Sequence, residues 1–450
     1  MTNTPTVPPS PELPEADFLI KPGWLVTMEP GAPIYEDRLI AIKDDRIVGL
    51  PRVEEASTWQ CEESLDLPEH ALLPGLINAH GHAAMSLLRG FADDLPLMPW
   101  LEQHIWPAEN AHVSAEFVRD GSSLAMAEML LSGTTTFSDM YFYPDIVADL
   151  CIDTGMRAQL ASPIFDFPTL WGSGAEDYIS KALELRDDYK NQSRLQVAFG
   201  PHAPYTVSRS NLEKVATFAA ELDMPVQIHL HETTGEVLAA VEAEGQRPID
   251  TLLEAGLLGP RTQCVHMTDL GQQDIDTLAA SGAQVVHCPQ SNMKLASGTC
   301  PVNRLLEAGI NVALGTDGAA SNNDLNLFNE MHSAALLAKL STGDATVMPA
   351  SSALHMATLG GARALGLEAE IGSIRVGKQA DLIAVDLSGP ATQPLYNPLS
   401  QLVYACTGGE VTHSWVAGQP LMRGRRLLTL DLAEILTRAR YWRDKISEGV

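Results

Sequence analysis

The sequence predicts an α/β protein in which a (β/α)8 barrel, the TIM-barrel fold, is joined to a small β-sandwich built from both ends of the chain. Three observations support this prediction. Eight short apolar runs of β character alternate with amphipathic helical stretches over about 300 residues, the pattern typical of a barrel. Short alternating segments separated by turns occur before the first run and after the last one. Polar residues directly follow several runs, where a barrel places its functional residues.

The β-sandwich is predicted over residues 16–73 and 372–430. Asp44-Asp45 fits the turn of a hairpin between two of its strands. The strand-like segments of this unit are 18–20, 24–27, 38–42, 46–50, 372–378, 380–386 and 414–418. Residues 1–15 are rich in proline, and we expect them to form a disordered leader. Residues 431–450 are expected to form a C-terminal helix.

The barrel is predicted over residues 74–371. Its eight strands are expected at 76–79, 134–137, 157–160, 195–199, 226–230, 263–266, 284–287 and 312–315. The alternative is an open doubly wound sheet. Such a sheet would not bring the first and eighth strands together, and no G-x-G-x-x-G motif opens a helix in this chain.

Composition excludes several classes of partner. The 450 residues include 29 Lys and Arg against 57 Asp and Glu, a net charge of −28, and no basic run occurs. Nucleic acids and anionic membranes are therefore poor partners. The sequence lacks a signal-peptide pattern and an apolar stretch of transmembrane length. Its six cysteines lack C-x-x-C spacing, which fits buried free thiols, and we expect a cytoplasmic protein.

Histidines and carboxylates at the strand ends predict one metal site. His80 and His82 are two residues apart at the end of an apolar run, so in a strand they point the same way. His229 ends the fifth predicted strand and Asp317 follows the eighth, which neighbours the first in a closed barrel. Three imidazoles and one carboxylate suit zinc and leave room for an activated water, although iron or manganese would also fit. Hydrolysis is therefore the favoured chemistry.

Two further residues near these strand ends are candidates for proton transfer. Glu232 lies three residues past His229, near the predicted metal, where it could shuttle a proton; alternatively it is a carboxylate favoured at a helix N-terminus. His266 ends the sixth strand and could orient water, or it could be a buried structural histidine. In an ideal strand His231 shares a face with His229, so spacing alone does not decide which of the two is the ligand.

A longer set of motifs resembles a known family. The segments His80–Leu101, Ile105–Glu109, Gly200–Tyr205, His229–Thr233, Leu314–Asn323 and Gly377–Leu382 closely resemble the 5-methylthioadenosine/S-adenosylhomocysteine deaminases of the amidohydrolase superfamily. The resemblance spans nearly the whole chain beyond the leader. It implies a metal-dependent barrel and hydrolytic deamination at C6 of an adenine nucleoside, and we expect a homo-oligomer.

The resemblance also implies residue roles. It makes His80, His82, His229 and Asp317 the ligands of one divalent metal, Glu232 the acid/base residue, His266 the water-orienting histidine, Glu109 the acceptor for the ribose hydroxyls and His202 the contact to the purine ring. In the expected mechanism Asp317 accepts a proton from water and Glu232 passes one to N1. Trp100 and Met98 would suit the apolar walls of the nucleoside site. Two-metal relatives carry a carbamylated lysine after the fourth strand, whereas this chain has Phe199-Gly200-Pro201-His202.

The sequence also bears on the choice of substrate. Relatives acting on S-adenosylhomocysteine place arginines after the third and fourth strands, whereas residues 162–172 contain no basic residue. A carboxylate without a charged partner binds weakly, and a methylthio group prefers apolar walls, so we expect methylthioadenosine to be preferred. The alternatives are hydrolysis of another heteroaromatic ring, such as guanine, a pterin or a triazine, and a metal-free binding or assembly protein that has lost catalysis.

Overall fold

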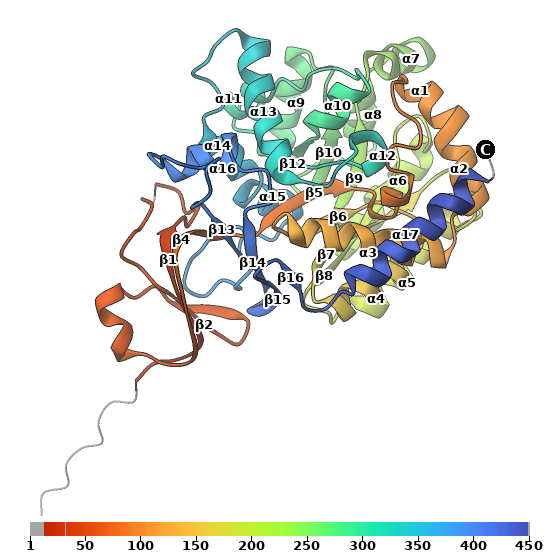
Figure 1. Cartoon of the computed structure of the whole chain (residues 1–450). Helices are drawn as coiled ribbons and strands as arrows, with labels where there is room; N and C mark the ends of the chain where they lie inside the picture. Colours follow the sequence, from red (N-terminus) through yellow and green to blue (C-terminus); the bar gives the residue numbers. More distant parts are fainter. Residues whose placement is uncertain (1–12, 32, 449–450) are drawn as a thin grey trace, which may run out of the picture.

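The computed structural model describes residues 13–31 and 33–448 and contains two sheets (Figure 1). Eight parallel strands follow one another in sequence order and form the predicted barrel, which is confirmed. Their bounds are β5 (Leu76–Gly81), β6 (Thr134–Asp139), β7 (Arg157–Ile164), β8 (Leu195–Pro201), β9 (Val226–Leu230), β10 (Thr262–His266), β11 (Gln284–His287) and β12 (Val312–Leu314). All but β8 and β11 are buried along their whole length, which explains their near-continuous apolar character.

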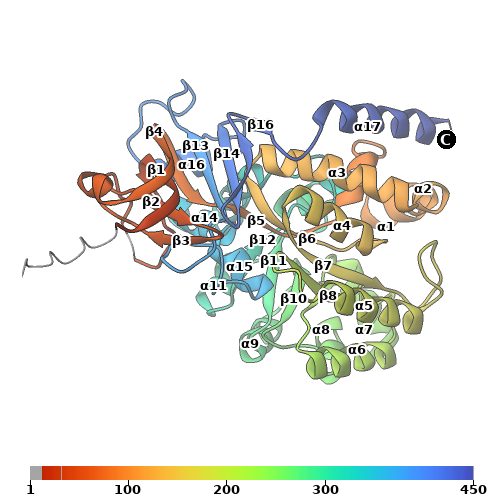
Figure 2. The same ribbon diagram turned by 90° about the horizontal axis from the view of Figure 1, so that it is seen from below.

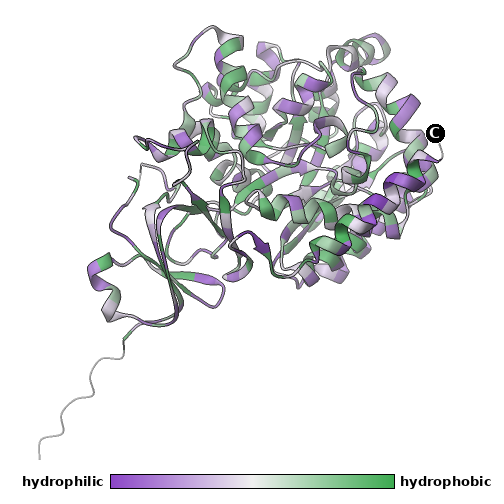
Figure 3. Ribbon diagram, viewed as in Figure 1, coloured by the Kyte–Doolittle hydropathy of each residue, from purple (hydrophilic) through white to green (hydrophobic). Residues whose placement is uncertain are grey.

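Helices cover the outside of the barrel, and Figure 3 shows both hydrophilic and hydrophobic segments along them. The longer ones are α3 (Ala115–Leu131), α4 (Pro144–Thr154), α5 (Ala175–Tyr189), α6 (Arg209–Leu222), α7 (Thr234–Glu244), α9 (Gln272–Ser281) and α13 (Leu327–Thr342). Shorter ones are α8 (Pro248–Glu254), α10 (Pro289–Lys294), α11 (Val302–Glu307), α12 (Ala319–Asn322), α14 (Ala350–Met356) and α15 (Leu359–Leu365). None of the helices among the described residues combines the length and apolar character needed to span a bilayer.

The segment between β5 and α3 forms a series of short helical turns. They are the 3₁₀ turn η2 (Ala83–Leu88), α1 (Leu97–Trp100), the π-helical turn η3 (Leu101–Ile105) and α2 (Trp106–His112). Trp100, Leu101 and Ile105 are buried in the barrel's core cluster, so this segment packs against the barrel. It carries several of the predicted substrate contacts.

Both ends of the chain build the second sheet, as predicted. Its strands are β1 (Glu15–Leu25), β2 (Ile40–Lys43), β3 (Arg46–Gly49), β4 (Gln60–Pro74), β13 (Leu382–Asp386), β14 (Val411–Val416), β15 (Gln419–Arg423) and β16 (Arg426–Leu427), with the 3₁₀ helix η1 (Val53–Thr58) and α16 (Pro398–Tyr404) beside them. They form one mixed sheet, with parallel and antiparallel pairs, in the strand order β16-β15-β14-β13-β4-β1-β2-β3. Ile20, Ile42 and Trp415 share one core there, so distant parts of the chain are packed together.

The structure corrects two details of the predicted ends. Segment 372–378 forms bends and turns, because Gly372 and Gly377 have φ angles of 85° and 95°, which an extended strand does not allow. Residues 1–12 of the predicted leader, 1–15, lie outside the described residues. The last residue of that predicted leader, Glu15, already belongs to β1. In the segment expected to be helical at the C-terminus, α17 (Leu432–Ser447) lies along α3, as both ribbon views show (Figures 1 and 2).

Candidate metal centre and substrate cavity

The first and eighth barrel strands meet at the candidate metal centre. His80 lies near the end of β5, His82 directly follows that strand, and Asp317 lies three residues past β12. The Asp317 backbone N–H donates to the His80 carbonyl oxygen at 3.1 Å, so a hydrogen bond joins the segment after β12 to β5 at this point. A Cβ atom at Gly315 would lie 2.9 Å from the His80 Cβ, so glycine permits this close approach. The sequence expectation that these strand ends meet is thus realised.

Three histidines present their ring nitrogens to a common point. Candidate ligand atoms of His80, His82 and His229 all lie within 4.8 Å of one another. The Asp317 Oδ1 atom lies 3.2 Å from His82 Nε2 and 3.6 Å from His80 Nε2. The His80 Nε2 atom is buried and has no hydrogen-bond partner among the described residues. A buried polar atom without a partner, among nitrogen and oxygen donors, fits a first-row divalent cation.

The structure brings His229 into this group and turns His231 away. β9 ends at Leu230, and His231 has a φ angle of 51°, so the strand alternation stops before it. Its ring instead bridges the loop after β10 and the start of α8, with Nδ1 2.8 Å from the Asp269 carbonyl oxygen and Nε2 accepting from the Ile249 N–H at 3.2 Å. The ambiguity left by the sequence is thus resolved by backbone conformation.

Asp317 is held in place by neighbours that the sequence did not reveal. Ser291 and Ser321 hydroxyls donate to its Oδ2 at 2.6 and 3.0 Å, and the Gly318 N–H donates to Oδ1 at 2.7 Å. Its own φ angle is 62°, an uncommon conformation for a residue with a side chain. Burial alone would raise the pKa of this carboxyl, but the imidazole rings of His80 and His82 beside it hold the pKa well below its usual range.

Glu232 is fixed by the start of α7. The Thr233 hydroxyl accepts from the Glu236 N–H at 3.1 Å, and the Glu236 carboxylate accepts in return from the N–H groups of Glu232 and His231 at 2.7 and 3.2 Å. This is a variant of the capping box in which the carboxylate accepts from the two residues that precede the N-cap Thr233. Burial, followed by the charges of Asp317 and Glu236, raises the pKa of Glu232 well above its usual value. Its carboxyl therefore holds a proton more readily than an exposed one.

His266 faces the Glu232 carboxyl from β10. Its Nε2 lies 3.8 Å from Glu232 Oε2, while its Nδ1 contacts the Asn292 side-chain amide at 3.0 Å. Burial, with the nearby histidine charges, lowers its pKa to about 3. The ring is thus neutral near pH 7 and lies beside both the Glu232 carboxyl and the candidate metal ligands His80 and His229.

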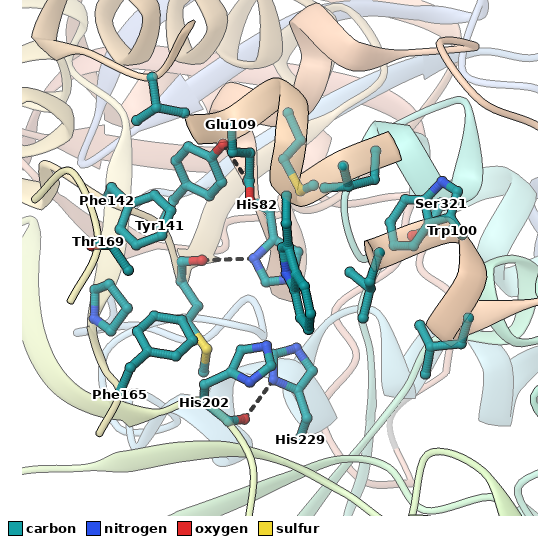
Figure 4. A pocket seen from close by; sticks show the side chains of 18 of the residues that line it. His82, Trp100, Glu109, Tyr141, Phe142, Phe165, Thr169, His202, His229 and Ser321 are labelled. Carbon is teal, nitrogen blue, oxygen red and sulfur yellow. Dashed lines mark hydrogen bonds between the residues drawn. The ribbon is translucent and has the colours of Figure 1, made fainter. Parts of the chain in front are cut away.

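A cavity of about 330 Å³ opens above these residues. Figure 4 shows His202 and His229 at the bottom of the view, Glu109 at the top and His82 between them, with Tyr141 and Trp100 to either side. The Tyr141 hydroxyl donates to Glu109 Oε1 at 2.6 Å. Burial raises the pKa of Glu109 to about 7, although that hydrogen bond opposes the shift. The His202 ring packs on Phe165, with ring centroids 4.9 Å apart. A volume of this size accommodates a small aromatic ligand.

The structure separates the two predicted apolar wall residues. Trp100 is buried and lines the cavity, but Met98 is 41 % exposed and does not line it. The prediction for Met98 is therefore wrong. Positions three and four apart share a helix face, so Leu97, Trp100 and Leu101 face the cavity while Met98 points outward.

Sequence reasoning missed several contributors to the site. Tyr141 follows β6 and reaches Glu109, while Ser291 and Ser321 hold Asp317. Isolated serines and tyrosines carry no spacing signal, so they could not have been singled out. Thr233 and Glu236 could have been, because the T-x-x-E pattern at a helix start is the signature of a capping box.

Comparison with known proteins agrees with this geometry. Residues 71–421 match the Amidohydrolase family. A 5-methylthioadenosine/S-adenosylhomocysteine deaminase from Teredinibacter turnerae is 50 % identical over 99 % of both chains, and one from Saccharophagus degradans is 51 % identical over 96 % of this chain and 97 % of its own.

A solved structure extends the likeness to three dimensions. A zinc-bound adenosine deaminase from Xanthomonas campestris is 48 % identical, with a TM-score of 0.95 over 97 % of this chain and 100 % of its own. Both the sequence match and the fold therefore cover nearly the whole length of these relatives. The chain belongs to the amidohydrolase family and, within it, to the 5-methylthioadenosine/S-adenosylhomocysteine deaminases.

Proposed function

We propose that the protein catalyses hydrolytic deamination of adenine nucleosides at C6, preferring 5′-methylthioadenosine, to give 5′-methylthioinosine and ammonia. The observation that carries the proposal is the buried Glu232 carboxyl. It lies at the cavity wall, 3.8 Å from His266 and next to the cluster of His80, His82, His229 and Asp317. A carboxyl of raised pKa beside a group of metal-ligating side chains suits proton transfer to a heteroaromatic ring.

His80, His82, His229 and Asp317 would hold one divalent cation, and we propose zinc, with iron or manganese as alternatives. A cation bound there supplies the Lewis acidity that lowers the pKa of water toward neutrality and so provides a nucleophile. A single ion is favoured because β8 ends in Phe199-Gly200-Pro201, which offers no lysine for a second one.

The two carboxyls divide the proton transfers. Asp317 is ionised because its pKa is strongly lowered, so it can accept a proton from the attacking water as the nucleophile reaches C6. Glu232, which has a raised pKa, donates a proton to N1 and so makes C6 more electrophilic. Its neighbour His266 is neutral and directs a ring nitrogen toward the same space. Asp317 then passes its proton to the leaving amine, while Glu232 takes up the proton of the attacking hydroxyl, so both carboxyls return to their starting states.

The remaining polar groups suit the nucleoside. Glu109 accepts from Tyr141 and keeps its second oxygen for a ribose hydroxyl. His202 lies against Phe165 and would contact the purine ring, and Trp100 supplies a flat apolar wall. The ribose contact distinguishes the proposal from hydrolysis of a free heterocycle such as guanine, a pterin or a triazine.

The cavity wall supports methylthioadenosine as the preferred substrate. Among the described residues that line it there is no lysine or arginine, whereas Phe142, Phe165, Phe167 and Leu170 all contribute. The carboxylate of S-adenosylhomocysteine would lack a charged partner here, and a methylthio group packs well on aromatic rings. We further expect a homo-oligomeric, cytoplasmic enzyme. Gel filtration with light scattering would test the first expectation, and subcellular fractionation would test the second.

The proposal is tested by following ultraviolet conversion of the adenine ring to hypoxanthine. Zinc-loaded protein is mixed with methylthioadenosine, S-adenosylhomocysteine, adenosine and free adenine in parallel. We expect the highest kcat/KM with methylthioadenosine and the lowest with free adenine. Equal values for methylthioadenosine and S-adenosylhomocysteine would contradict the apolar-wall argument alone. Failure with all three nucleosides would contradict the proposed reaction.

A further inference from the structure

Below the metal centre, the barrel interior contains a layer of buried amide and hydroxyl side chains. Ser138, Gln159, Gln227 and Gln263 are fully buried, and they come from strands β6, β7, β9 and β10 of the barrel. Barrels of this type normally fill this space with branched apolar side chains. Burying an amide is unfavourable unless its hydrogen bonds are satisfied, so this layer calls for a physical reason.

The layer touches the metal centre at His80. Each of the three clustered histidines uses Nδ1 for a contact that fixes its ring. His82 Nδ1 lies 2.6 Å from the Met140 carbonyl oxygen, and His229 Nδ1 lies 2.7 Å from the His202 carbonyl oxygen. His80 Nδ1 instead lies 2.8 Å from Oε1 of the Gln227 side chain. Of the three rings, His80 is thus the one whose orientation depends on a side chain.

A backbone carbonyl can only accept, so it dictates the tautomer of the imidazole that it contacts. A glutamine amide is different because it can present either its oxygen or its NH₂ group. If Gln227 presented NH₂, His80 Nδ1 would have to accept and Nε2 would carry the proton. That tautomer leaves no lone pair on Nε2 for a metal. The orientation of the Gln227 amide therefore decides whether His80 can be a ligand.

The surrounding acceptors fix that orientation. Gln227 Nε2 has three acceptor atoms within reach of its two hydrogens: the Ala79 carbonyl oxygen at 3.0 Å, the Ser138 hydroxyl at 3.0 Å and Gln263 Oε1 at 2.6 Å. The Ala79 carbonyl cannot donate, so the atom facing it must be the NH₂ group. The Ser138 hydroxyl passes its own proton on to Gln159 Oε1 at 3.2 Å and is free to accept. Oε1 of Gln227 therefore points at His80.

We infer that Gln227 is a positioning residue for the metal centre: by accepting the Nδ1–H of His80, it keeps His80 Nε2 unprotonated and directed at the cation. The buried His80 Nε2 has no hydrogen-bond partner among the described residues, as expected of an atom reserved for a metal. Polar contacts of this kind behind a metal-ligating histidine fix its ring and raise its basicity. The inference rests on the proposed metal centre but not on the choice of substrate.

The test is zinc affinity, measured in the absence of substrate by competition with a chromogenic chelator. Gln227→Met keeps the side-chain length but removes the acceptor, and we expect zinc to bind roughly 10- to 100-fold more weakly. Gln159→Met is the matched control, because it removes a buried amide of the same layer that does not contact His80. Its zinc affinity should stay close to that of the wild type.

Two further variants keep the test decisive if Gln227→Met does not fold. Gln227→Glu keeps the acceptor at the same distance, and in its protonated form it also keeps a donor, so it should retain zinc. Gln227→Asn keeps an amide but withdraws it by one methylene, so it should lose affinity. The visible spectrum of bound cobalt should change in Gln227→Asn and stay unchanged in Gln159→Met.

The outcomes separate this inference from the proposed function. Wild-type affinity in Gln227→Met or Gln227→Asn, or equal losses in Gln227→Glu and Gln227→Asn, would overturn the role of the Gln227 acceptor. Wild-type protein that binds zinc but deaminates none of the nucleosides would overturn the proposed function and leave the positioning role intact.

Discussion

The two ends of the barrel bury charged groups in different ways. At the carboxyl-terminal end, Glu109 and Glu236 receive hydrogen bonds from a tyrosine hydroxyl and backbone N–H groups, and burial raises the pKa of each to about 7. At the amino-terminal end, Arg157 at the start of β7 donates to both oxygens of Asp381, at 2.8 and 3.1 Å, and both side chains are almost fully buried.

This difference separates function from stability. The Arg157–Asp381 pair joins the barrel to the second sheet, and the Ala417 N–H completes the hydrogen bonding of Asp381 at 2.7 Å. The two charges compensate each other, so the pair can remain buried where the barrel meets the second sheet and stabilise that contact. The carboxyls at the other end are held under conditions that penalise ionisation, which is typical of functional sites. Substitutions at the two ends should therefore affect different properties.

The largest expected effect is at Glu232. Gln at this position keeps the shape but cannot transfer a proton, so kcat should fall by about 10²–10⁴-fold. Zinc content and thermal stability should stay near wild type, because Glu232 is not among the clustered ligand atoms. Metal analysis and a steady-state assay check both. Loss of zinc together with activity would instead make Glu232 a ligand.

The next effect is at the opposite end of the barrel. Arg157→Met leaves the Asp381 carboxylate buried without its partner, which should destabilise the fold by about 3–5 kcal/mol. The kcat per folded molecule should be unchanged. Arg423→Met is the control, because its pair with Glu63 is about one-third exposed on each side and should contribute less than about 1 kcal/mol. Urea unfolding measures all three proteins, and equal losses would contradict the distinction.

A smaller effect is expected at Glu109. Gln at this position loses the charged acceptor for a ribose hydroxyl, which is worth about 1.5–3 kcal/mol, or roughly 10- to 100-fold in kcat/KM for nucleosides. The activity of this variant on free adenine, which has no ribose, should equal that of the wild type. A uniform loss on both substrates would show that Glu109 acts on the ring instead.

The smallest effect is the pH dependence of stability in chelator-treated protein. Several buried histidines, including His202 and His266, have lowered pKa values because of burial, so stability is lost as pH falls below about 6.5. Glu109 and Glu236 have pKa values raised from 4.5 to about 7, so their contribution is lost as pH rises from about 4.5 to about 7, while the histidines outnumber them below pH 6.5. The metal-free protein should therefore be most stable near pH 6.5.

Thermal melts from pH 5 to 8 measure this maximum, with a decline of a few degrees on the alkaline side. Glu109→Gln removes one of the two carboxyls whose pKa is raised to about 7, so its decline between pH 6.5 and about 7 should be shallower. A melting temperature that rises steadily to pH 8 in the metal-free wild type would contradict the raised carboxyl pKa values.

The sequence predicted the barrel because its strands are apolar runs that alternate with amphipathic helical stretches. It predicted the histidine pair at β5 because residues two apart in a strand share a face. It missed β4, whose first half alternates exposed polar residues and whose middle contains Pro68, so it lacks the apolar character of the barrel strands. It also placed Met98 on the cavity wall, because spacing alone does not fix the phase of a four-residue helix.

The sequence by itself determined the fold class, the set of chemical groups at the strand ends and the family resemblance, because these depend on periodicity and residue type. Only the tertiary structure decided which groups converge. The positive φ at His231 selects His229, the close approach at Gly315 brings Asp317 beside His80, and the buried amides set the tautomer of His80. These features depend on contacts between residues far apart in the chain, and local patterns carry no record of such contacts.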